Sequence, residues 1–149
     1  MYKVRLWSVK HSRLLQTVYF MSAPALFSIL RGVDKLFGRS LDPPITALEA
    51  GIKGFLFDCK MCGDCILSKT GMSCPMNCPK SLRNGPCGGV RENSMCEVRP
   101  KMACVWVCAW EGAGRMKNAG AINNIQFALD YRKTGTSSWL ELARENQRK

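Results

Sequence analysis

The chain has 149 residues, and its 22 lysines and arginines outnumber 11 acidic residues, which gives a formal net charge of +11. A chain of this length is most simply one domain with extensions. All nine cysteines lie between residues 59 and 108. Their odd number, the tight spacing of the first three and the lack of a convincing secretory signal argue against a disulfide scaffold and for a metal site.

Residues 1–44 form the first predicted unit, an N-terminal helical arm. Apolar residues recur there at helical spacing, and Pro24 is expected to divide them into two helices, with Ser22 capping the second. The pair Pro43 and Pro44 is expected to end the arm in a linker. The uncharged run 14–30 has the outline of a signal peptide, but Pro24 interrupts it and it falls short of the about 20 apolar residues that span a bilayer. We therefore predict no membrane span and a cytoplasmic location.

Residues 45–110 form the second predicted unit, a cysteine-rich metal-binding core. Residues 45–57 are expected to be a short helix or an extended lead-in to the first cysteine. From residue 59 to 108 no periodicity is seen, and Gly, Pro and Asn are frequent, as in loops that wrap a cofactor. Apolar burial cannot offset the chain entropy of such a loop, whereas one structural metal site supplies on the order of 10 kcal/mol.

Residues 111–149 form the third predicted unit, a C-terminal helical arm. The pattern predicts one helix over Ile122–Tyr131 and another over Trp139–Arg144. Ser138 followed by Glu141 has the form of a capping box at the second helix. The predicted fold class is therefore a small, metal-stabilised, loop-rich cysteine core with flanking α-helices, mostly α plus irregular structure.

The spacing of the cysteines separates the possible metals. The opening CxxCxxC, at Cys59, Cys62 and Cys65, starts the bacterial ferredoxin pattern, in which a remote Cys-Pro completes each cluster. The only histidine, His11, is far from this block, and no second CxxC follows, so a Cys/His finger and a zinc ribbon are both disfavoured. The fourth ligand of the first cluster is Cys74, Cys78 or a later cysteine, and the remaining cysteines are left for a second cluster. All-cysteine zinc is the alternative.

The segment 84–89, Asn-Gly-Pro-Cys-Gly-Gly, is a second candidate site. Its glycines permit positive φ and a close approach of backbone N–H groups to cluster sulfides or to a partner's cofactor. A tight surface turn is the alternative interpretation. The candidate cofactor-binding residues are Asn84, Gly85, Gly88 and Gly89.

These motifs, in this order, resemble the methylenetetrahydrofolate reductase C-terminal domain family. The resemblance rests on Cys62-Gly-Asp-Cys65, on Cys74-Pro-Met-Asn-Cys78-Pro-Lys80, on 84–89, on Cys96-Glu-Val98 with Cys104-Val-Trp106, and on the Gly-Thr-Ser-Ser-Trp-Leu of 135–140, and it covers roughly 55–143. It implies an iron-sulfur subunit beside a flavin-containing reductase. The eight cysteines recurrent in the family correspond to Cys59, Cys62, Cys65, Cys74, Cys78, Cys87, Cys96 and Cys104. Cys108 is a ninth, and its role is open.

The chain carries no signature for the cofactors that transfer hydride. No GxGxxG follows a strand, and too little regular structure remains for a folate-binding barrel. We therefore expect flavin and folate on the partner, and here a non-catalytic subunit with two [4Fe-4S] clusters that relays electrons or stabilises the complex. A zinc-stabilised nucleic-acid-binding module and a stand-alone ferredoxin-like carrier are the rivals. The scattered basic residues disfavour nucleic acid and are candidates for an acidic partner surface or plain solvated surface: Lys80, Arg83, Arg91, Arg99 and Lys101.

Overall fold

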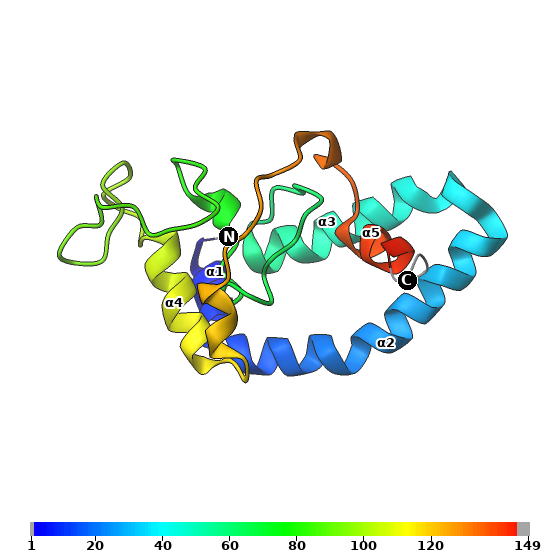
Figure 1. The fold of residues 1–149 in the computed structure, drawn as a ribbon, viewed down its shortest axis with the longest axis horizontal. Helices are drawn as coiled ribbons and strands as arrows, with labels where there is room; N and C mark the ends of the chain where they lie inside the picture. The colour runs from blue at the N-terminus through cyan, green and yellow to red at the C-terminus, as the bar shows by residue number, and fades with distance from the viewer. Residues whose placement is uncertain (1, 146–149) are drawn as a thin grey trace.

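The computed structural model describes residues 2–145, which form helices and loops with no strand among them (Figure 1). Helical and irregular structure was predicted, and that part of the fold class is confirmed. The α-helices are α1 Tyr2–Lys10, α2 Ser12–Phe37, α3 Asp42–Phe57, α4 Val105–Arg115 and α5 Ser138–Glu145. Four short 3₁₀ turns join them: η1 Gly38–Leu41, η2 Pro75–Asn77, η3 Ala119–Asn123 and η4 Tyr131–Lys133.

The predicted break at Pro24 is wrong, because α2, which is 26 residues long, continues through this residue. Proline removes one backbone hydrogen bond and crowds the preceding turn, which bends a helix without always ending it. In Figure 1, α2 curves along one side of the molecule. Ser22 caps nothing, since its hydroxyl donates to the Tyr19 carbonyl within the helix (3.2 Å).

Pro43 and Pro44 begin a helix, which corrects their assignment to a linker. They lie in the first turn of α3, where a missing N–H costs nothing because the first N–H groups of a helix have no intrahelical partner. The turn η1 joins α2 to α3, and α3 returns on the opposite side of the molecule, with α5 and the cysteine loops between them (Figure 1).

The C-terminal arm contains one of its two predicted helices. The second is confirmed as α5, but its cap is Ser137, whose Oγ accepts a hydrogen bond from the Leu140 N–H (3.2 Å), so the capping residue lies one position before Ser138. The predicted helix Ile122–Tyr131 is wrong: η3 ends at Asn123 and the chain then runs extended. Gln126 bonds to the Asn84 side chain through both its N–H and its C=O, so neither group is free for a helical bond.

The helices of the two predicted arms pack on each other and on the loops. Helix α2 contacts α4 and α5, and α1 contacts α3 and α4. The main cluster beneath the cysteine loops joins Phe57 to Leu67, Met72, Cys74 and Met116. Helices α3 and α4 cross the predicted limits at 44/45 and 110/111, and the division into three units stays a prediction.

By length and composition, the helical stretch Ser12–Phe57 is apolar enough to cross a membrane, and 17% of its most apolar window is buried. Core helices of soluble proteins and signal sequences meet the same criterion. The prediction that the chain has no membrane span is therefore neither confirmed nor contradicted.

Candidate metal centres

The first four cysteines line one cavity at the end of α3. Cys59, Cys62 and Cys65 come from the loop that follows the helix, and Cys74 is the residue before η2. Helix α3 ends at Asp58, which adopts a left-handed conformation (φ 51°) and turns the chain into this loop. The structure therefore selects Cys74 from the candidates for the fourth position of this group.

The next four cysteines line a second cavity. Its walls include Cys78, Cys87, Cys96 and Cys104, together with the buried Trp106. Cys104 immediately precedes α4, so the positive end of the helix dipole lies at this cavity. We call the two sets the first and second cysteine groups.

The turn η2 connects the two groups. It has only three residues, Pro75–Asn77, with Cys74 before it and Cys78 after it. Each flanking residue has an extended backbone, and the side chain of Asn77 donates to the Phe57 carbonyl (2.9 Å), which fixes the turn to the end of α3. One short turn thus supplies a thiol to each group.

Cys108 lines neither cavity. It lies in the first turns of α4, is 9% exposed, and burial raises its thiol pKa. A buried free thiol behaves as a small hydrophobic side chain. The structure therefore separates this cysteine from the eight that the family resemblance had selected.

The cavities of the two cysteine groups are similar in size. The spaces among the walls of the two cavities are about 370 and 330 Å³. Among residues 2–145, no three His, Cys, Asp or Glu side chains are gathered as one metal ion requires. Zinc draws its thiolates to about 2.3 Å, whereas a four-iron cube holds them farther apart. The thiols of both groups lie mainly on loops.

A buried ion pair lies beside the first group. Lys53 and Glu49, one turn apart on α3, are bonded to each other and line the first cavity. Glu49 also accepts from the hydroxyls of Ser137 and Ser138 and, at 3.3 Å, from the Trp139 N–H. Burial lowers the pKa of Lys53, but the nearby Cys65 and Glu49 raise it more, so its pKa is above the usual value. The first group therefore faces a fixed ammonium.

The thiols of the first group have shifted pKa values. A hydrogen bond from Cys74 is the largest influence on Cys59 and, against the opposing effect of burial, lowers its pKa to about 6. The same bond, with burial, raises the pKa of Cys74 well above normal, and burial raises that of Cys65. Cys59 is therefore the most acidic of these three thiols, and thiolate is the form in which cysteine binds metal.

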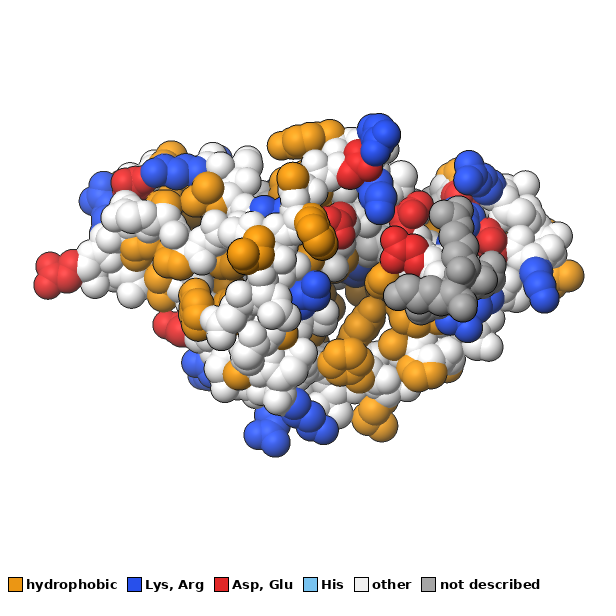
Figure 2. All heavy atoms as spheres, in the orientation of Figure 1, with side chains coloured by type: hydrophobic (Ala, Val, Ile, Leu, Met, Phe, Trp, Pro, Cys, Tyr) orange, Lys and Arg blue, Asp and Glu red, His pale blue; other side chains and the backbone are white. Residues whose placement is uncertain are grey.

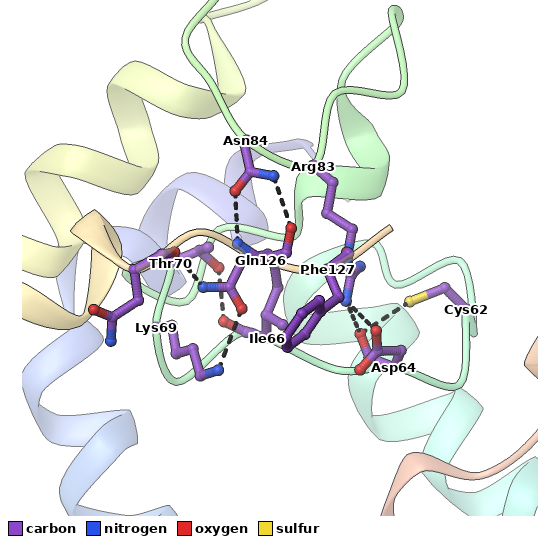
Figure 3. A network of polar contacts seen from close by, with 10 residues as sticks. Cys62, Asp64, Ile66, Lys69, Thr70, Arg83, Asn84, Gln126 and Phe127 are labelled. Carbon is purple, nitrogen blue, oxygen red and sulfur yellow. Dashed lines mark hydrogen bonds and ion pairs between the residues drawn. The ribbon is translucent and has the colours of Figure 1, made fainter. Parts of the chain in front are cut away.

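Arg83 and Asn84 tie the first group to the C-terminal segment (Figure 3). The Arg83 guanidinium donates to the Asp64 carbonyl and carboxylate (2.9 and 2.5 Å) and to the Phe127 carbonyl (3.0 Å). Asn84 exchanges two hydrogen bonds with the Gln126 backbone (2.9 and 2.8 Å). The Arg83 side chain is 9% exposed, so this residue joins the two segments and is not a solvated surface residue.

The predicted glycine site has a different geometry from the one expected. Gly85, Gly88 and Gly89 all lack positive φ. A Cβ on Gly85 would lie 2.6 Å from the Trp106 ring, and one on Gly89 would collide with the Glu97 carboxylate, whereas Gly88 faces open space. Two of the glycines therefore make room for side chains around the second cavity, and Asn84 acts through Gln126. Binding of a cofactor by these four residues stays a prediction.

Sequence reasoning missed Glu49, Lys53 and the role of Gln126. The spacing of Glu49 and Lys53, four residues apart on a predicted apolar segment, was the available signal for an internal ion pair. No local signal marks Gln126, because its partner Asn84 is 42 residues away.

Comparison with curated proteins and with solved structures gives no match. Comparison with protein families gives one over residues 39–132, which is more than half of the chain, to the family described as methylene-tetrahydrofolate reductase C terminal. This range begins and ends earlier than the 55–143 of the sequence resemblance. It includes α3, α4 and all nine cysteines. The chain belongs to the methylene-tetrahydrofolate reductase C-terminal family.

Proposed function

We propose that this chain is a non-catalytic, iron-sulfur-binding subunit of a methylenetetrahydrofolate reductase, acting in the cytoplasm. It holds two [4Fe-4S] clusters and relays electrons to, or stabilises, the subunit that carries flavin and folate. The observation that carries this proposal is the division of eight cysteines into two groups of four, each around its own cavity.

The residues of each group have separate tasks. The thiolates of the first group, Cys59, Cys62, Cys65 and Cys74, would hold one cluster, and those of the second group the other. Such clusters supply one-electron redox chemistry when bound. Lys53 places positive charge beside the first group, while α4 directs its positive end at the second. Both features favour an anionic, and more reduced, centre.

The basic residues weaken the zinc-stabilised nucleic-acid-binding alternative. Two of the candidate basic residues are already engaged within the chain, since Arg83 is turned inward and Lys80 pairs with Glu97. The family assignment favours a reductase complex over a stand-alone carrier.

Metal analysis after anaerobic purification tests the proposal. We expect about eight irons per chain and a broad visible absorbance. Cys65→Ser and Cys96→Ser should each lose about four irons, one from each group, because each removes one of four ligands. Cys108→Ser is the matched control and should keep all eight. A colourless zinc protein, or equal iron loss in the Cys108 variant, would contradict the assignment.

The relay is tested separately with the flavin-containing subunit. The chemically reduced chain should recover its visible absorbance when it is mixed with the oxidised flavoprotein. A complex that forms without this recovery would reduce the role of the chain to stabilisation. Absence of any complex would leave the stand-alone carrier.

A further inference from the structure

A large apolar cavity lies between α2, α3, α5 and the cysteine loop. Its volume is about 470 Å³, within the ~300–1,000 Å³ of small-molecule sites. Apolar side chains supply most of its wall, among them Val18, Ile52 and Leu142. In Figure 2, hydrophobic side chains surround a hollow between α2 and the rest of the molecule.

The cavity adjoins the first cysteine group. Cys65 lines both this cavity and the cavity of the first group, as do Lys53 and Arg83. A molecule in the apolar cavity is therefore in contact with a residue that carries one of the four thiols. None of the other eight cysteines lines it.

The polar groups around this cavity indicate which kind of ligand it can bind. The indole of Trp139 lines the cavity, with the Lys53 ammonium 5.0 Å from the centre of its ring, and its Nε1–H is buried without an acceptor among residues 2–145. Lys69 is exposed at the rim, makes no ion pair within the described chain, and donates only to Gln126 Oε1 (3.2 Å). A buried unpaired N–H is costly, and a carbonyl oxygen on a ligand would satisfy it after a small movement of the indole.

We propose that this cavity binds a flat aromatic redox ring that carries carbonyl oxygens, of the quinone or isoalloxazine class. The ring packs between the apolar wall of α2 and Trp139, with Lys69 complementing the negative charge of its reduced form. A redox role for the bound ring rests on the proposed function, since it depends on an iron-sulfur centre beside Cys65. The binding itself does not.

Calorimetric titration of the purified full-length chain tests the proposal. The probes are 2,3-dimethyl-1,4-naphthoquinone, whose blocked ring carbons prevent addition of thiols, and riboflavin. We expect saturable binding of one molecule per chain for at least one probe. Val18→Trp fills the cavity from α2 and should weaken binding at least tenfold. Ile29→Trp is the matched control, since Ile29 is exposed on the same helix and does not line the cavity.

A second variant tests the polar contact. Trp139→Phe keeps the aromatic face and removes the N–H, so affinity should fall about three- to tenfold, the usual value of one hydrogen bond. No saturable binding of either probe, or equal affinity in the Val18 and Ile29 variants, would overturn the proposal. Circular dichroism on each variant confirms that it is folded.

The source of the ring is decided by competition. Displacement of the bound probe by the flavin-loaded reductase subunit would identify the partner's flavin as the occupant, and retention of the probe would identify a free molecule. Either result supports the site. Iron content measured on the same samples keeps the two proposals apart: an iron-free chain that binds the probe contradicts the clusters alone, and an iron-loaded chain that does not bind contradicts the cavity alone.

Discussion

At the scale of single residues, the most consequential contact is the ion pair of Lys53 and Glu49. Both side chains are almost fully buried, at 6% and 1% exposure, and each has hydroxyl partners from the start of α5. A buried charge is tolerated only when it is paired and hydrogen-bonded. The pair thus links α3 to α5 directly beside the first cysteine group.

Replacing Lys53 with methionine should destabilise the protein by about 3 kcal/mol, because Glu49 would stay buried without its counter-ion. The change is measured as a lower midpoint of anaerobic urea unfolding. Arg132→Met is the control, since Arg132 also pairs with an acid, Asp130, but on the surface, and no measurable loss is expected. Equal stability of the two variants would show that the buried pair contributes little.

At the scale of elements, the cysteine loop is set against α4 by two glycines. Gly71 has a φ of +60°, and a Cβ there would lie 2.6 Å from the Gly112 carbonyl carbon and closer still to other backbone atoms of α4. A Cβ on Gly112 would in turn collide with Gly71. Only residues without side chains allow this backbone contact.

Gly71→Ala should therefore cost about 2–4 kcal/mol, from the left-handed backbone and the overlap together. Gly114→Ala, in the same helix with open space around its Cβ, should be neutral or stabilise by up to about 1 kcal/mol. Unfolding midpoints of both variants give the comparison. A mild effect at Gly71 would mean that the loop can move away from the helix.

Local sequence predicted elements well where local forces decide them. The periodicity at 139–144 predicted α5, and the CxxCxxC spacing predicted that Cys59, Cys62 and Cys65 lie together. The predictions of a helix break at Pro24 and of a linker at Pro43 were wrong because the effect of proline depends on its position in a helix.

Which later cysteine completes each group was not predictable from spacing. The path of the loop depends on contacts between distant residues, such as Gly71 against α4 and Asn84 with Gln126. The failed helix at 122–131 has the same origin. The apolar pattern there favoured a helix, and a side chain 42 residues away took the backbone bonds instead.

At the scale of the whole molecule, removal of metal should unfold the loops before the helices. Residues 59–104 have little regular structure and small clusters of buried side chains, so the proposed centres would supply most of their stability. We expect chelation under oxidising conditions to make this segment sensitive to limited proteolysis. A metal-free chain with unchanged melting temperature and cleavage pattern would contradict this.

The ends of the helical arms are joined by Arg144, which binds Asp34 of α2 and Asp42 of α3 (2.5 and 2.7 Å). The hydrogen bond from Arg144 lowers the pKa of Asp34 below its ordinary 3.8. A lowered folded-state pKa stabilises the fold above the unfolded-state pKa, and this contribution is lost as pH falls through the folded value.

The stability difference between the native chain and Asp34→Asn should therefore be present at pH 6 and shrink below about pH 4. We expect it to be within roughly 1 kcal/mol, since the pair is partly solvated. Urea unfolding at pH 3 to 7 measures it. A difference that is constant over this range would show that the aspartate pKa is not shifted by Arg144.

The short length of η2 limits where the chain can accept inserted residues. Since its two ends deliver one thiol each to neighbouring sites, a residue inserted there would displace both thiols together. Longer loops elsewhere, such as the one between Cys87 and Cys96, can absorb extra length without this effect. Insertions during evolution should thus be tolerated around the two sites but not between them.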